Sequence, residues 1–146
     1  NVASDAHKGV SLDFENLQGE RRYSGWGAYQ RSKPGNILFT RELATRVDPR
    51  QVTVNCLHPG FVASNFADDE RGGIAWAIKA AKNVFAINVE KGAQTSIYLC
   101  SSDEVADVTG GYFVKSRLSQ PSRQAQDPAA QKQLWAVSER LTGIMP

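Results

Sequence analysis

A tyrosine and a lysine four residues apart, Tyr29 and Lys33, are the pair in this sequence best suited to acid–base chemistry. In a helix, positions i and i+4 lie one above the other on a single face, so an ammonium group would stand beside a phenol. A nearby positive charge favours the phenolate form, which lets the phenol give and take a proton closer to neutral pH. The same spacing also arises by chance on a helix flank beside a solvated lysine.

Two further segments carry groups that could complete a site with this pair. Residues 1–4 are typical of a strand end, and residues 51–57 predict a short strand that His58-Pro59-Gly60 terminates. Ligands of an open parallel sheet bind beyond the carboxyl ends of its strands, so Ser4 and the 58–60 turn are expected at one crevice. Each also has a purely structural explanation, as a turn serine and as an ordinary strand terminator.

The elements that must position these groups alternate between helices and short strands. Apolar spacing predicts a helix over about residues 27–46. Pro34 should kink this helix without ending it. The kink could turn the Lys33 side chain away from Tyr29. Further helices are expected over 88–101 and 129–141, and a strand over 112–114. This alternation, with crossovers of a dozen residues or more, predicts an α/β fold with parallel strands.

Several other segments have a structural or pocket-lining interpretation. The polar, glycine-rich residues 5–27 predict a long loop that could form a binding-site wall. Residues 74–85 are apolar on several faces and, with Phe61, could line a pocket; the acidic run 68–70 before them suits a helix start better than a metal site.

Histidines provide no metal site in this sequence. His7 and His58 lack a carboxylate or cysteine cluster at ligand spacing, and their expected positions in polar loops account for both. No metal is therefore predicted.

Composition limits the classes of partner. The 146 residues suffice for one domain, and a net charge of +2 gives no reason to expect nucleic acid or an anionic membrane. No run of 18 apolar residues predicts a membrane span, and no signal peptide is apparent, which leads us to expect a cytoplasmic protein. Cys56 and Cys100 lie in apolar contexts and are expected to be buried, reduced thiols.

Three segments, in the expected order, resemble the second half of a short-chain dehydrogenase/reductase, and in particular its retinol dehydrogenase-like branch. They are Asn1-Val2-Ala3-Ser4-Asp5-Ala6-His7, Tyr29-Gln30-Arg31-Ser32-Lys33 and His58-Pro59-Gly60-Phe61-Val62. Residues 16–20, 36–40 and 90–95 are also similar to stretches of that branch. The resemblance implies that residues 1–146 are the C-terminal part of a single NAD(P)-binding domain, a Rossmann-like doubly wound parallel sheet with flanking helices.

The resemblance also implies an activity and a catalytic set. The protein would transfer a hydride between a nicotinamide cofactor, NADP or NAD with NADP slightly favoured, and an alcohol or carbonyl of a lipophilic small molecule. The family's catalytic serine, tyrosine and lysine fall on Ser4, Tyr29 and Lys33. Tyr29 would exchange a proton with the substrate oxygen, Ser4 would hydrogen-bond that oxygen, and Lys33 would bind the nicotinamide ribose.

The cofactor-binding residues implied by the resemblance are, besides Tyr29 and Lys33, the group Pro59, Gly60, Val62 and Ser64, the last at a position where threonine is usual. The glycine-rich turn, the residue that selects NAD or NADP and the catalytic asparagine of the family are missing, and we expect them, with the N-terminal half of the domain, to precede Asn1. The alternative is a truncated, non-catalytic half domain or interaction module that binds no cofactor. The substrate, the direction of reaction and a homo-oligomeric state stay open.

Overall fold

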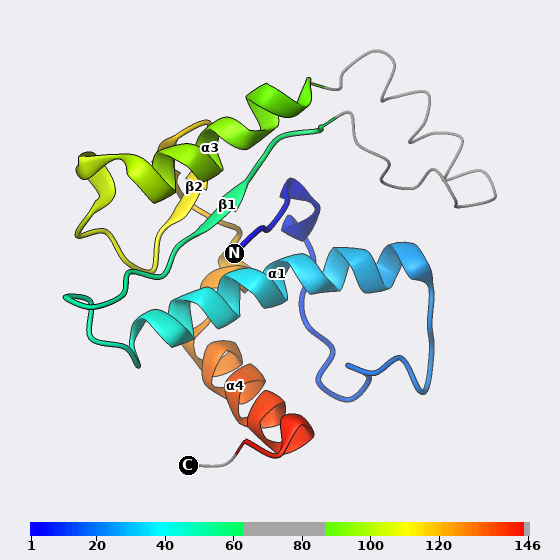
Figure 1. Cartoon of the computed structure of the whole chain (residues 1–146). Coiled ribbons are helices and arrows are strands. Elements are labelled where there is room, and N and C mark those ends of the chain that lie inside the picture. The colour runs from blue at the N-terminus through cyan, green and yellow to red at the C-terminus, as the bar shows by residue number, and fades with distance from the viewer. Residues whose placement is uncertain (63–86, 145–146) are drawn as a thin grey trace.

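The computed structural model describes residues 1–62 and 87–144, and its helices lie on both sides of a small sheet (Figure 1). The helices are α1 (Gly25–Ala44), α3 (Val89–Ser101) and α4 (Pro128–Thr142), with short 3-10 helices η1 (Asp5–His7), η2 (Asp103–Val105) and η3 (Arg123–Gln126). The strands are β1 (Cys56–His58), β2 (Tyr112–Val114) and β3 (Arg117–Ser119). The pocket-covering segment predicted over 74–85 and the acidic run 68–70 lie outside the described residues.

The sheet is mixed, with strand order β1-β2-β3. β1 and β2 are parallel, and Val2 forms a further parallel bridge to Leu57 on β1, so the predicted strand end at residues 1–4 and the parallel pairing are confirmed. β3 was not predicted, and it pairs antiparallel with β2. Lys115 and Ser116 connect the two strands with φ angles of 52° and 58°. Such turns usually contain Asn or Gly, so this sequence carried no hairpin signal.

β1 and β2 are buried on both faces of the sheet, and successive side chains on each strand point to opposite faces. Cys56 and Tyr112 pack on one face with Ile37 of α1, whereas Leu57 and Phe113 pack on the other. Tyr98 and Leu99 of α3 join the second cluster. Cys56 and Leu57 of β1 therefore face the two buried sides of the sheet.

Helix α1 runs through Pro34 as one element. Ser24 caps its start, since the Ser24 hydroxyl accepts a hydrogen bond from the amide of Gly27 at 3.1 Å. A proline inside a helix costs about 3 kcal/mol, because it removes one hydrogen bond and crowds the preceding turn. The Pro34 ring is fully buried, as are Ile37 and Leu38 on the same helix, so apolar burial offsets part of that cost.

Helix α3 has small residues at its most buried positions. Gly92 and Thr95 are its buried residues, while Ile97 is 59% exposed and Cys100 is exposed. A Cβ added to Gly92 would lie 2.6 Å from Cγ2 of Val62, so the close approach of α3 requires a very small residue there. The expectation of a buried thiol is thus wrong for Cys100 and confirmed for Cys56.

The last helix packs on α1 rather than on the sheet. The α4 residue Trp135 stacks on Phe39 of α1, with ring centroids 5.6 Å apart and planes inclined by 13°. Arg46 lies over the same indole, with Cζ 4.4 Å from its ring centroid. Within the described ranges, no helix combines the length and apolar character that a membrane crossing needs.

Candidate active site

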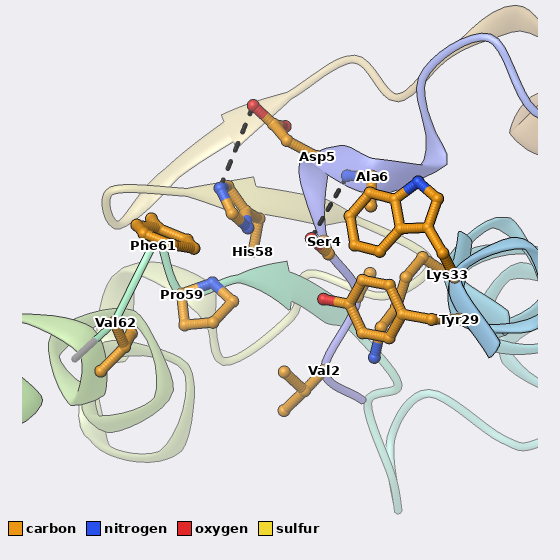
Figure 2. Close-up of a pocket in the computed structure, with 13 residues that line it drawn as sticks. Val2, Ser4, Asp5, Ala6, Tyr29, Lys33, His58, Pro59, Phe61 and Val62 are labelled. Atoms are coloured by element: carbon orange, nitrogen blue, oxygen red, sulfur yellow. Dashed lines mark hydrogen bonds and ion pairs between the residues drawn. The ribbon is translucent and has the colours of Figure 1, made fainter. Parts of the chain in front are cut away.

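A cavity of about 840 Å³ opens where residues 1–4 and β1 end, next to the N-terminal half of α1 (Figure 2). Its volume lies within the range of about 300–1,000 Å³ that is usual for small-molecule sites. The cavity is lined by side chains from three separate stretches: Val2, Ala3, Ser4, Asp5 and Ala6; Trp26, Tyr29 and Lys33; and His58, Pro59, Gly60, Phe61 and Val62.

The structure brings together nearly all residues that the sequence analysis singled out. The lining includes Ser4, Tyr29, Lys33, Pro59, Gly60 and Val62. Ser64, the remaining predicted cofactor-binding residue, lies outside the described residues. The crevice expected beyond the strand ends therefore exists.

The Tyr29–Lys33 pair has the geometry that helical spacing predicts. Nζ of Lys33 lies 4.8 Å from the centroid of the Tyr29 ring, a cation–π arrangement. Pro34 consequently does not turn the lysine away from the tyrosine. Trp26, one turn earlier on α1, stacks against Tyr29 with centroids 5.5 Å apart and planes inclined by 27°. The phenol is thus held in place by side chains of its own helix.

Ser4 is both a turn serine and a cavity residue. It caps η1, and its Oγ accepts a hydrogen bond from the amide of Ala6 at 3.2 Å. A serine hydroxyl has one donor and two acceptor positions, so accepting this bond leaves its proton available to a ligand oxygen. Figure 2 shows Ser4 between the Tyr29 ring and His58. All three residues line the cavity, so a ligand oxygen bound there could accept the Ser4 proton.

Two hydrogen bonds fasten α1 to the strand end that carries Ser4. The side-chain amide of Asn36 donates to the carbonyl of Val2 at 2.9 Å, and that of Asn1 donates to the Thr40 hydroxyl at 2.8 Å. These bonds set the separation between Ser4 and the Tyr–Lys pair. The sequence analysis missed Asn36 and Thr40, although residues 29, 33, 36 and 40 follow the spacing of one helix face and could have indicated them.

The 59–60 turn depends on glycine. Gly60 has a φ of +91°, and a Cβ there would lie 2.8 Å from Cδ1 of Ile87. Beyond it, the amide of Ile87 donates to the carbonyl of Phe61 at 2.8 Å, and Val62 forms a parallel bridge with Ile87. The turn therefore ends β1, as the structural explanation held, and also leaves backbone without a side chain at the cavity wall.

An acid–imidazole pair lies at the rim of the cavity. Nε2 of His58 is 4.0 Å from Oδ2 of Asp5, and the same carboxylate accepts hydrogen bonds from Lys8 at 2.9 Å and from the Tyr112 hydroxyl at 3.3 Å. Burial lowers the pKa of His58 below its ordinary value and outweighs the opposite effect of Asp5.

For the Asp5 carboxyl, the neighbouring groups have more effect on the pKa than burial does. Its burial raises the pKa, but the hydrogen bond from Lys8 and the charge of His58 outweigh this and hold the pKa below its ordinary value. The pKa values of both groups at this rim are therefore lowered, that of His58 by burial and that of Asp5 by its neighbours.

The histidines do not occupy the polar loops expected for them. His58 is the last residue of β1 and half-buried, and His7 is wholly buried in η1. Polarity of a loop therefore does not account for either residue. Among residues 1–62 and 87–144, no group of three or more His, Cys, Asp or Glu residues could hold a metal ion.

Comparison with known proteins identifies relatives of this chain. Residues 5–74 match the sequence model of the family described as short chain dehydrogenase. The chain is 40% identical to human retinol dehydrogenase 14 over 149 residues and 35% identical to human retinol dehydrogenase 13 over 156 residues, with 99% of the chain covered in both.

A solved structure supports the fold. The crystal structure of an uncharacterized protein from Mycobacterium paratuberculosis matches 97% of this chain and 48% of its own, with a TM-score of 0.70 and 29% sequence identity. The chain spans 44% of the length of human retinol dehydrogenase 14 and 45% of that of human retinol dehydrogenase 13, so it corresponds to less than half of these relatives.

Proposed function

Since this chain belongs to the short-chain dehydrogenase family and is retinol dehydrogenase-like, we propose that it contributes the catalytic half-site of an NAD(P)-dependent oxidoreductase acting on an alcohol or carbonyl. The observation that carries the proposal is that Ser4, Tyr29 and Lys33 line one cavity. Ser4 reaches it from a strand end and the other two from α1, so the fold brings together the groups that acid–base chemistry needs.

The residues present fit a nicotinamide nucleotide. Lys33 supplies a cation and, with Tyr29, hydrogen-bonding groups suited to a ribose, on the wall formed by α1. On the wall formed by residues 58–62, Gly60 presents backbone without a side chain to the cavity. Pro59, Gly60 and Val62 would hold the nicotinamide end, and Ser64 is proposed to join them. Either NADP or NAD is compatible with these residues.

The proposed roles follow from the chemistry of each side chain. The cofactor, when bound, supplies or accepts the hydride. The Tyr29 phenol gives a proton to the substrate oxygen in reduction and takes it back in oxidation. The Ser4 hydroxyl donates a hydrogen bond to that oxygen and stabilises the charge that develops on it. The Lys33 ammonium holds the phenol in place through its contact with the ring face.

The substrate class follows from the remaining lining of the cavity. Val2, Trp26, Phe61 and Val62 present apolar surface next to Tyr29. Such a wall favours a lipophilic alcohol or aldehyde over a sugar or a charged metabolite. The relatives that carry retinol in their names agree with this choice, so retinol and retinaldehyde are suitable first probes.

Nucleotide binding is the first experiment. NADPH and NADH are titrated into the purified protein while tryptophan fluorescence is followed, because Trp26 lines the cavity. We expect saturable quenching that a Trp26→Phe variant loses, with binding of the same variant still detected by calorimetry. A folded protein that binds neither nucleotide would contradict the proposal and favour a non-catalytic module.

The decisive variant is Tyr29→Phe, which removes only the hydroxyl. Loss of a positioned proton donor should lower turnover of retinaldehyde by about 10²- to 10⁴-fold. Nucleotide affinity should fall far less than turnover, because the Tyr29 hydroxyl is only one of the groups proposed to contact the nucleotide and the ring keeps its contacts with Trp26 and Lys33. Turnover in the variant equal to that of the unmodified protein would show that Tyr29 is not the proton donor.

A further inference from the structure

His7 is a wholly buried polar residue beside the candidate site, with 0% of its surface exposed. Its imidazole does not line the cavity, and no proposed step uses it. The ring packs edge-on against Tyr112, with centroids 5.3 Å apart and planes inclined by 72°. A histidine placed in a core in this way needs partners for both ring nitrogens.

Both nitrogens have such partners, and the partners define the tautomer. Nδ1 contacts the carbonyl oxygen of Ser4, which can only accept a hydrogen bond. Nε2 lies 3.0 Å from the backbone nitrogen of Ser122, which can only donate. Nδ1 therefore carries the proton and Nε2 is the acceptor, so a neutral imidazole joins two backbone groups that are far apart in the sequence.

The Ser4 end of this bridge is the residue on which the proposed chemistry depends. Its carbonyl accepts a second hydrogen bond, from the amide of His7 at 3.1 Å. Its hydroxyl is directed by the amide of Ala6 in the same turn. The turn η1 is only three residues long, so its own hydrogen bonds provide little stability. Besides the contacts of Asp5 with Tyr112 and His58, the hydrogen bond with Ser122 connects this turn to a distant part of the chain.

The other end lies at the start of η3. Ser122 precedes this short helix, and Ala125 within it is fully buried in the core that includes Ala3 and Ile37. The Ser122 hydroxyl is also 3.5 Å from the carbonyl of His7, a second and weaker link between the same two segments. The segment around Ser122 is therefore connected to Ser4 at the cavity wall by hydrogen bonds through His7.

We propose that His7 is a positioning residue, whose buried imidazole holds the Ser4 backbone against the Ser122 amide and so fixes the Ser4 hydroxyl at the edge of the cavity. This inference rests on the proposed function in one respect, the role of Ser4 in turnover. An apolar residue of similar size would fill the same space but would not orient the Ser4 carbonyl. His7 touches neither substrate nor cofactor in this scheme and acts only through Ser4.

The experiment compares two substitutions at Ser122 that leave His7 and Ser4 intact. Ser122→Pro removes the amide proton that His7 accepts, and the φ of −60° at this position is the one that proline adopts. Ser122→Ala keeps that amide and removes only the hydroxyl, so it is the matched control. The difference between the two variants isolates the hydrogen bond to Nε2.

Two readouts are measured on each variant. One is hydrogen exchange at the amide of Ala6, whose partner is the Ser4 hydroxyl. The other is the kinetics of retinaldehyde reduction with NADPH. Ser122→Pro should accelerate the Ala6 exchange and lower kcat by about tenfold with KM nearly unchanged, because misplacement of a catalytic group affects the transition state more than binding. Ser122→Ala should behave like the unmodified protein.

A second variant covers the case in which Ser122→Pro fails to fold. His7→Asn keeps a donor near the Ser4 carbonyl and loses the acceptor for Ser122, so it should reproduce the effects of Ser122→Pro. Exchange at Ala6 that is the same in all folded variants would overturn the positioning role.

Ser4→Ala separates this inference from the proposed function. If Ser4→Ala lowers turnover and the Ser122 variants do not differ, the proposed function stands and the role of His7 is wrong. If Ser4→Ala leaves turnover unchanged, or the unmodified protein has no activity, the proposed function fails, and exchange at Ala6 alone decides whether His7 holds Ser4.

Discussion

At the scale of single residues, the Lys33 ammonium lies over the face of the Tyr29 ring. A cation over a ring face is attracted to its electrons and restrains the side chain that carries them. Lys33 therefore restrains the position of the phenol ring on α1. For His58, which lines the same cavity, burial lowers the pKa and outweighs the effect of the nearby Asp5 carboxylate.

His58 should make the stability of the protein depend on pH. Burial lowers its pKa below the ordinary value of 6.5, so the unfolded chain takes up this proton at a higher pH than the folded protein does. The free energy of unfolding should therefore decrease as the pH falls below about 6.5. Urea denaturation at about pH 7 and about pH 5.5 measures this change, and His58→Gln should reduce it. An equal pH dependence in that variant would show that His58 is not responsible.

The two cysteines should differ in reactivity. Burial raises the pKa of the Cys56 thiol to about 11, whereas Cys100 is exposed. Since the thiolate is the reacting form, a maleimide at about pH 7.5 should label Cys100 and leave Cys56 unmodified in the folded protein. Mass spectrometry counts the labels, with Cys100→Ser as the control that should take none. Labelling of that control before denaturation would contradict the burial of Cys56.

At the scale of elements, α1 is the part on which the site depends. One face of this helix carries the Tyr–Lys pair and then Asn36 and Thr40, which fasten it to the strand end at residues 1–4. The helix thus both presents the proposed catalytic groups and fixes their distance from Ser4. The helix continues through Pro34, and a break there would separate Tyr29 and Lys33 from the residues that bind the strand end.

Asn36→Ala should test the fastening of α1. The substitution removes the hydrogen bond to the carbonyl of Val2, at a cost of about 1 kcal/mol in the free energy of unfolding. Turnover should fall by about tenfold because Ser4 and Tyr29 lose their fixed separation. Gln30→Ala, elsewhere on the same helix, is the control and should change neither quantity. Full turnover in Asn36→Ala would show that this bond does not set the site.

At the scale of the whole molecule, two separate cores support one cavity. The α1 side of the sheet and the α3 side are filled by alternating residues of the same strands, so a change on one face affects the other through β1 and β2. Helix α4 packs on α1 (Figure 1) and supplies no residue to the lining of the cavity. The C-terminal helix therefore contributes to stability rather than to chemistry.

Trp135→Ala should reveal this division. The indole stacks on Phe39 and beneath Arg46, and its loss should lower the free energy of unfolding by about 2 kcal/mol, less than for a fully buried tryptophan. The KM for substrate should not change, because α4 supplies no residue to the cavity. Denaturant unfolding and steady-state kinetics measure the two effects, with Lys132→Ala as an exposed control on α4. Unchanged stability would show that α4 does not depend on this contact.

The sequence alone determined the features that follow from local periodicity. Helical spacing predicted α1, α3 and α4 and placed Tyr29 and Lys33 on one face, and the alternation of elements predicted parallel pairing near residues 1–4 and β1. Family likeness placed Ser4 and the Pro59-Gly60 turn in the same site, and the structure brings them to one cavity. Such features depend on residues close together in the chain or on segments with a recognisable pattern.

Only the tertiary structure decided which faces are buried and which distant groups meet. The apolar context of Cys100 predicted its burial, but α3 approaches Val62 through Gly92, and Cys100 is exposed. The hydrogen bond between His7 and Ser122 joins residues 115 positions apart, which no local pattern encodes. Burial and long-range hydrogen bonds depend on how whole elements pack, and that packing is a property of all the elements together.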